Sequence, residues 1–231
     1  MKELATIDTT EIKISTVEAF VEIKPENGTD FQEARDFLRK EFSGESIKKE
    51  EKNLDGISYE ERLKHVPING KNGYYEGIRG ESKFIPSEAT ARGVTCKEKL
   101  AEYGVDGIEY KGGKADFSKV SYVTVEIENM TENRADYRKN SDWRPGNFSQ
   151  ADAKAAEQWN AEGKDGRTNW TDKDVYNFRK DPEHKYTWHE RCDTKTMDLV
   201  PYEIHSFFGH LGGVAECKVR DAQNNGGEFD E

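Results

Sequence analysis

The segment 186–213 constrains the fold of this 231-residue chain more than any other part of it. Its first three residues, Tyr-Thr-Trp, favour a strand, and 197–200 alternates apolar and polar residues as a short return strand does. A turn is expected between them at 193–195. Pro201 suits the first position of a helix, where its missing N–H would have no partner, and Gly209 is a natural left-handed cap at the end of that helix. The pattern predicts a strand, a turn, a second strand and a short helix.

Three of the five histidines lie in this segment: His189, His205 and His210. The last two are five residues apart, a spacing that separates them by about 140° on one continuous helix. A chain reversal at Gly209 would bring them back together, so the spacing alone leaves both arrangements open. Imidazoles exchange protons near neutral pH and bind divalent ions, which makes the group typical of a single-metal hydrolytic site. The alternative is that the histidines pack in a core or hold a structural metal.

The composition bounds the number of domains. Hydrophobic residues make up 33% and charged residues 35%, but 11 Phe, 10 Tyr and 4 Trp argue against wholesale disorder. We expect one large folded domain, or a domain with an N-terminal extension.

The chain shows neither a membrane-length apolar run nor a secretory signal peptide, so we expect a soluble protein. The three cysteines form no C-x-x-C pair and are expected to be reduced thiols.

The net charge of −11 is unfavourable for binding nucleic acid, so its distribution matters. Acidic residues are concentrated at the two ends, with a net charge of −6 over 1–60 and −4 over 221–231, while 184–220 is neutral. A basic stretch interleaved with Tyr137 and Trp143 could contact a phosphate backbone through Arg134, Arg138, Lys139 and Arg144. An ordinary solvated surface is an equally good interpretation of that stretch.

Local signals predict the remaining elements. Residues 11–24 indicate a strand or hairpin, 31–41 a helix, 42–58 a charged linker, and 120–128 a half-buried strand. Three capping-box patterns predict helices that begin at about 96, 150 and 172. The polar tail at 223–231 is expected to be frayed.

The runs YTWHERCD and TMDLVPYEIHSFFGHLGG resemble the HNH nuclease domains of colicin-type DNases and related bacterial polymorphic toxins. Upstream, the runs GIRGES, GIEY and ADFS resemble segments that precede this motif in such toxins, so the resemblance covers about 72–218. It implies an α+β fold of mixed helices and short antiparallel strands with a C-terminal ββα-metal finger at 185–213. We expect an acidic N-terminal segment of unknown role at 1–60 and a nuclease domain at 61–231.

The resemblance implies a metal-dependent endonuclease that hydrolyses phosphodiester bonds, with DNA favoured over RNA. The expected cofactor is one divalent ion: Mg²⁺, Mn²⁺, Zn²⁺ or Ni²⁺. A toxin of this kind implies a cognate immunity protein, export by a specialised route, and action in the cytoplasm of a target cell. Two alternatives are a non-enzymatic, metal-stabilised binding module and an inactivated nuclease relative.

One departure from the family pattern affects the site residues. Many relatives carry two histidines after the tryptophan, whereas this chain has His189 followed by Glu190. Our preferred hypothesis makes His189 the general base, with His205 and His210 as metal ligands. Glu190 or Asp193 would complete the coordination or orient an imidazole. The competing assignment has His189 as a third ligand and Glu190 as the base.

Two arginines are expected to clamp the phosphate, Arg79 and Arg134, because a guanidinium matches phosphate bidentately. Either could instead make a structural ion pair. Trp188 is expected to pack in the core beneath the site rather than to stack on a base.

Overall fold

The computed structural model describes residues 56–225. The elements expected at 11–24 and 31–41, and nearly all of the linker expected at 42–58, lie outside this range. The description below concerns the unit Asn53–Glu231 within those described residues. Within the described range, no helix is both long enough and apolar enough to cross a membrane.

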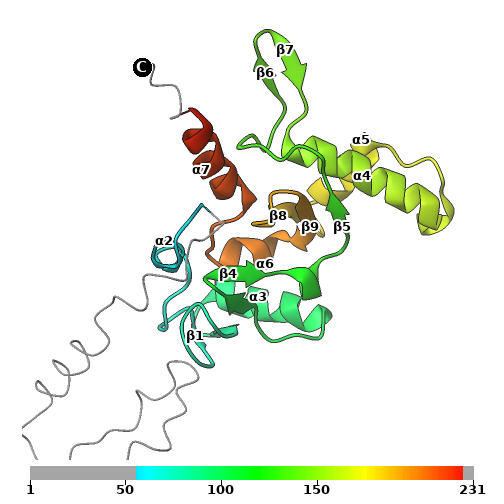
Figure 1. Ribbon diagram of the computed structural model, residues 1–231. Helices are drawn as coiled ribbons and strands as arrows, with labels where there is room; N and C mark the ends of the chain where they lie inside the picture. The colour runs from blue at the N-terminus through cyan, green and yellow to red at the C-terminus, as the bar shows by residue number, and fades with distance from the viewer. Residues whose placement is uncertain (1–55, 226–231) are drawn as a thin grey trace, which may run out of the picture. The chain divides into compact units, whose positions relative to one another are not determined.

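The structure is α+β, with mixed helices and short antiparallel strands, as the sequence predicts (Figure 1). The helices are α2 (Tyr59–Leu63), α3 (Ala91–Glu102), α4 (Asn147–Glu162), α5 (Asp172–Lys180), α6 (Tyr202–Phe207) and α7 (Gly213–Asn225), with short 3₁₀ turns η4 (Ser118–Val120) and η5 (Lys164–Gly166). The strands are β1 (Gly73–Tyr75), β2 (Phe84–Pro86), β3 (Glu109–Lys111), β4 (Lys114–Asp116), β5 (Thr124–Glu126), β6 (Tyr137–Lys139), β7 (Asp142–Arg144), β8 (Tyr186–Glu190) and β9 (Thr196–Pro201).

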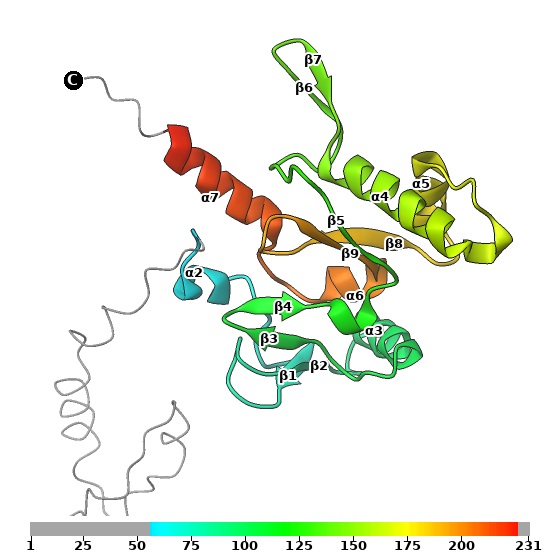
Figure 2. The ribbon, with the colours of Figure 1, turned by 45° about the vertical axis from the view of Figure 1, so that its right-hand side comes forward.

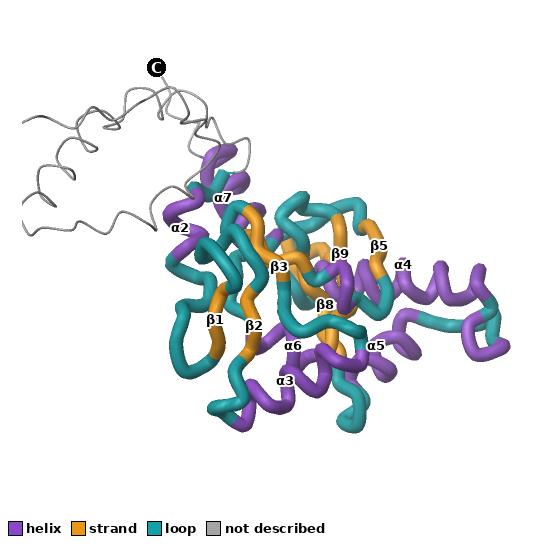
Figure 3. The backbone as a smooth tube through the Cα atoms, turned by 90° about the horizontal axis from the view of Figure 1, so that it is seen from below, coloured by secondary structure: helices purple, strands orange, loops and turns teal. Residues whose placement is uncertain are grey.

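A three-stranded antiparallel sheet in the order β5-β9-β8 lies at the centre of the described fold. Helices α4 and α5 lie on one side of it, and α6, α3 and the β3–β4 hairpin lie on the other (Figure 2). Because successive strand residues face opposite sides, Trp188 and Leu199 pack into the core beneath α4, whereas Val200 packs into a second core with Ile204 of α6. In the view from below, α3 and α6 lie side by side across this second core (Figure 3).

The predicted strand–turn–strand–helix unit is present as β8, β9 and α6, with two local differences. Pro201 is the last residue of β9 and the N-cap of α6, because its ψ of 133° is extended, so the helix begins one residue later than predicted. The expectation of a left-handed cap at Gly209 is wrong. Helix α6 ends at Phe207, and Gly209 is not among the positive-φ glycines. Gly209 is instead required by space, because a Cβ atom there would lie 2.5 Å from the carbonyl oxygen of His65.

The other predicted starts vary in accuracy. Helix α5 begins at Asp172 as predicted, with a capping box between Thr171 and Asp174. Helix α3 begins at Ala91 rather than at about 96, because Thr90 and not Thr95 is its N-cap. Helix α4 begins at Asn147, three residues before the predicted start. The strand expected over 120–128 is present as β5 at the centre of that range.

Candidate metal centre

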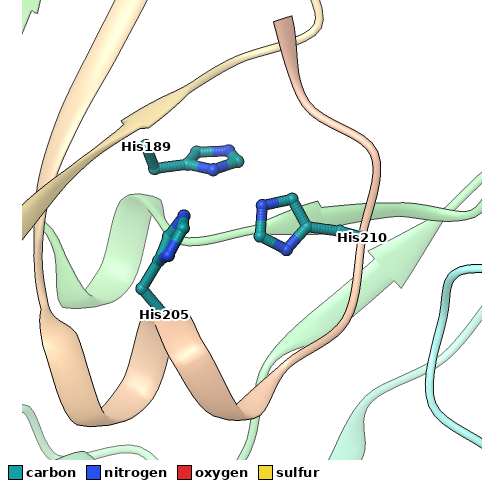
Figure 4. A group of neighbouring side chains, drawn as sticks. All are labelled: His189, His205 and His210. Carbon is teal, nitrogen blue, oxygen red and sulfur yellow. The ribbon is translucent and has the colours of Figure 1, made fainter. Parts of the chain in front are cut away.

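Three histidine side chains converge from separate parts of the C-terminal unit (Figure 4). His189 lies on β8, His205 on α6, and His210 on the segment that follows α6. One ring nitrogen from each lies within 4.8 Å of the others. The ring centroids are 4.8 to 5.5 Å apart in all three pairs. The expected chain reversal after α6 is therefore present, and within residues 56–225 this is the one His, Cys, Asp or Glu group of three or more that could hold a metal ion.

Phe117 closes the inner side of the histidine group. Its ring centroid lies 4.7 Å from that of His189, 5.5 Å from His205 and 5.1 Å from His210. The phenyl ring is only 1% exposed and belongs to the core that α6 covers. An apolar wall of this kind excludes water from one side of the imidazoles and leaves the other side to a ligand.

Hydrogen bonding leaves ring nitrogens available in the group. The carbonyl oxygen of Phe208 lies 2.8 Å from Nδ1 of His210, and since a carbonyl can only accept, Nδ1 carries the proton and Nε2 keeps its lone pair. Nε2 of His205 is buried and has no hydrogen-bond partner. A buried nitrogen without a partner carries a free-energy cost that a metal ion would remove. The residues present therefore fit a divalent ion.

The electrostatic environment keeps the imidazoles neutral. Burial lowers the pKa of His189 well below its ordinary value, and the neighbouring His210 and His205 lower it further. Burial, with His210 and Arg134, lowers the pKa of His205 to about 3. Burial also lowers the pKa of His210, although the Phe208 carbonyl opposes this. The neutral ring is the form that binds metal ions.

Glu190 lies outside the histidine group. It follows His189 on β8 and therefore faces the opposite side of the sheet, where its cross-strand partner is the core residue Met197. Its carboxylate is 3% exposed and accepts a hydrogen bond of 3.1 Å from Nε of Arg134. Burial raises the pKa of Glu190, while the charge of Arg134 lowers it.

Asp193 also lies outside the group. Its Oδ1 accepts hydrogen bonds from the backbone N–H groups of Lys195, at 3.0 Å, and Thr196, at 2.8 Å. Its Oδ2 accepts a third from the Thr196 hydroxyl, at 2.5 Å. Both oxygens are thus engaged in the turn between β8 and β9, which is the turn that the sequence predicts at 193–195.

The two predicted phosphate clamps have different surroundings. The Arg134 side chain is 59% exposed, is held by Glu190, and contributes to lowering the pKa of all three histidines. Arg79 instead donates to three backbone carbonyls near the end of α2, those of Pro67, Leu63 and Val66, at 2.6 to 3.0 Å. The structure brings Arg134 close to the histidine group and gives Arg79 a role in holding a loop.

The remaining predicted cations, Arg138, Lys139 and Arg144, are exposed on the β6–β7 hairpin. A hollow of about 660 Å³ is lined in part by His189 and Phe117 and so adjoins the histidine group. Its lining includes Lys111, Lys114 and Arg191, together with Asp198, whose carboxylate receives two hydrogen bonds from Arg191.

Sequence reasoning missed a buried network that supports β8. The Asp152 carboxylate accepts a hydrogen bond from Nε1 of Trp188 at 2.8 Å, and from Nε and Nη2 of Arg179 at 2.8 and 2.9 Å. All three side chains are nearly fully buried, which places Trp188 in the core as predicted. The hint in the sequence is a carboxylate flanked by Ala151, Ala155 and Ala156 on a predicted helix, since a charge that is buried among small apolar residues requires a partner.

Comparison with known families adds one finding. Residues 107–212 match the family model of the DNase/tRNase domain of colicin-like bacteriocin. The matched range runs from β3 through α6 and includes all three histidines and Arg134. No curated protein and no solved structure matches the chain.

Proposed function

We propose, from the premise that residues 107–212 form a colicin-type nuclease domain, that this chain hydrolyses phosphodiester bonds with a divalent ion bound by His189, His205 and His210. The convergence of three neutral imidazoles is the observation that carries the proposal. A divalent ion at such a site lowers the pKa of water and offsets charge on a phosphate.

The position of His189 favours a ligand role over a general-base role. Its ring centroid lies 4.8 Å from that of His210 and 5.5 Å from that of His205, compared with 5.0 Å between those two rings. Its pKa, lowered well below the ordinary value by burial, makes it a weak proton acceptor near neutral pH. Assignment of His189 as the base, with two ligands only, has less support for both reasons.

Arg134 and Glu190 form a second functional pair in this proposal. Arg134 is exposed enough to meet a phosphate, and its guanidinium suits two phosphate oxygens. Glu190 accepts from Nε and so fixes the direction of the guanidinium from its buried side. The role of Glu190 is then to position Arg134, and not to take a proton from water.

A catalytic site is better supported than a metal-stabilised binding module. Structural zinc sites close their shell with four protein ligands and favour cysteine, whereas catalytic sites keep an open position. Cys192 interacts with Arg62 and with the Leu211 carbonyl, and Cys217 donates to the Met130 carbonyl. Neither cysteine joins the histidine group, so the protein supplies three ligands within the described range.

The proposed biological setting is that of a bacterial toxin. The expected substrate is nucleic acid, with DNA favoured, and the exposed cations of the β6–β7 hairpin would contribute to its binding. A cognate immunity protein would then protect the producer, and delivery by a specialised route would bring the chain to the cytoplasm of a target cell. A small adjacent reading frame whose product suppresses the toxicity of this chain would support that setting.

A cleavage assay on the full chain tests the activity. Wild-type protein is incubated with plasmid DNA or with transfer RNA, and with Mg²⁺, Mn²⁺, Zn²⁺ or Ni²⁺. We expect cleavage that is lost in His205→Ala and retained in His184→Ala, which removes a half-exposed histidine that lies beside Asp181. Intact substrates under all four ions, or equal activity in the two variants, would overturn the proposal.

A further inference from the structure

The β6–β7 hairpin is a regular ribbon with little support from the rest of the fold. Its strands pair as Tyr137 with Arg144, Arg138 with Trp143, and Lys139 with Asp142. The two-residue turn between them, at 140–141, has φ values of 52° and 71°. Positive φ at both positions is typical of a type I′ turn, which matches the right-handed twist of a two-stranded ribbon. The ribbon projects away from the sheet and from α4 in both side views (Figures 1 and 2).

The exposure of this hairpin is unusual. All three residues of β7 are exposed, and the side chain of Trp143 is 59% exposed. The largest apolar side chain of the hairpin is thus not used to attach it to the domain. A two-stranded hairpin without packing is only marginally stable in water, so a binding partner would stabilise this one.

The hairpin is also basic, in contrast to the whole chain. Residues 134–144 contain four cations and two carboxylates, a net charge of +2, whereas the chain has −11. Because directly paired residues share a face, Arg138 and Trp143 lie together on one side of the ribbon. Lys139 and Arg144 lie on the other side. One face thus offers an aromatic ring beside a guanidinium, and the other offers two further cations together with Tyr137 and Asp142, whose carboxylate lies 3.6 Å from Arg144.

The root of the hairpin lies near the histidine group. Arg134, three residues before β6, is paired with Glu190, and its charge is close enough to help lower the pKa of all three histidines. A nucleic acid whose phosphate contacts Arg134 would therefore extend toward the hairpin. The hairpin is in a position to bind the same nucleic acid at a point some distance from the bond that is cut.

We propose that the β6–β7 hairpin is an arm that enters the major groove of B-form duplex DNA, with Arg138 and Trp143 toward the bases and Lys139 and Arg144 toward the phosphates. This inference rests on the proposed function and adds a duplex-binding element to it. The major groove of B-form DNA admits a two-stranded ribbon, whereas that of A-form RNA is too narrow for side chains to read. The arm should therefore distinguish the two duplexes.

A binding experiment without cleavage tests the arm. The full chain is titrated, in EDTA, into a fluorescent DNA duplex, an RNA duplex of matched sequence, and the corresponding single DNA strand. The test variant is Arg138→Ala with Trp143→Ala. The matched control is Lys71→Ala with Tyr74→Ala, which likewise removes one cation and one exposed aromatic ring, on or beside β1.

We expect the hairpin variant to bind the DNA duplex at least about tenfold more weakly, since a good contact to a base edge contributes a discrimination of about that size. The RNA duplex and the single strand should lose less than about threefold, and the control should bind all three like wild type. An unchanged Kd for the DNA duplex, or an equal loss on both duplexes, would overturn the inference. Because no divalent ion is present, the result does not depend on whether the chain proves to be a nuclease.

Discussion

At the scale of single residues, the direction of each side chain along β8 separates the functional roles. His189 and Glu190 are adjacent, yet a strand turns successive side chains to opposite faces. The strand predicted from the first three residues of 186–213 extends through His189 and Glu190 in the structure, and this extension turns the two side chains apart. The pairing of Glu190 with Arg134 had no sequence signal either, because 56 residues separate the two positions.

Glu190 offers a direct test of the two assignments for the proton acceptor. In Glu190→Gln, Arg134 loses a charged partner but keeps a hydrogen-bond acceptor, so we expect a loss of about tenfold in kcat/KM. Arg134→Ala should cost at least as much, and the double variant should cost no more than Arg134→Ala. A loss in Glu190→Gln that far exceeds that of Arg134→Ala would instead identify Glu190 as the general base.

The histidines also predict a pH dependence of stability. Their pKa values are lowered in the folded chain, to about 3 for His205, against an ordinary value of 6.5. The unfolded chain therefore binds more protons in acid, and the free energy of unfolding should fall as the pH is lowered below 6.5 toward 3. Urea denaturation of the metal-free protein across this range measures the effect. In His205→Gln the free energy of unfolding should fall less steeply with decreasing pH than in wild type. An identical pH dependence in both proteins would contradict the burial of the His205 imidazole.

At the scale of elements, the sequence predicted those whose signals are local. Helix α5 has its whole capping box within four residues, and it begins where predicted. Helix α3 has two threonines that could act as caps, and the earlier one is used. Gly93, on the first turn of α3, approaches the Ser87 carbonyl so closely that a Cβ atom would lie 1.9 Å from it. Only glycine fits at this position of the first turn, and this agrees with a helix that begins after Thr90.

The packing of β8 on α4 yields a prediction about its buried network. Asp152→Asn would leave the Arg179 guanidinium buried without a charged partner, and we expect a loss of about 3 kcal/mol in the free energy of unfolding. Trp188→Phe keeps most of the ring but removes its hydrogen bond to Asp152, and should cost about 1 to 2 kcal/mol.

Urea denaturation of both variants, with Glu98→Gln as an exposed control on α3, measures these losses. A loss below about 0.5 kcal/mol in Asp152→Asn would show that the network contributes little to stability.

At the scale of the whole molecule, the site depends on contacts that no local pattern contains. The histidines come from a strand, a helix and the segment after it, and Phe117 joins them from a position 72 residues before His189. The sequence supplied the three histidines and the reversal that unites two of them. It could not show that the His189 ring lies within 5.5 Å of the other two, because that requires β9 and α6 to share a core with Phe117, against which the His189 ring lies. The third ring is what changes the preferred role of His189 from base to ligand.

Titration of the metal-free full chain with Co²⁺, followed by absorption spectroscopy, tests the three-imidazole site most directly. We predict one ion per chain, and at least about a tenfold loss of affinity in each of His189→Ala, His205→Ala and His210→Ala, since each removes one of three protein ligands. His184→Ala should bind Co²⁺ like wild type. Wild-type affinity in His189→Ala, together with weakened binding in the other two, would contradict the account and return His189 to the role of general base.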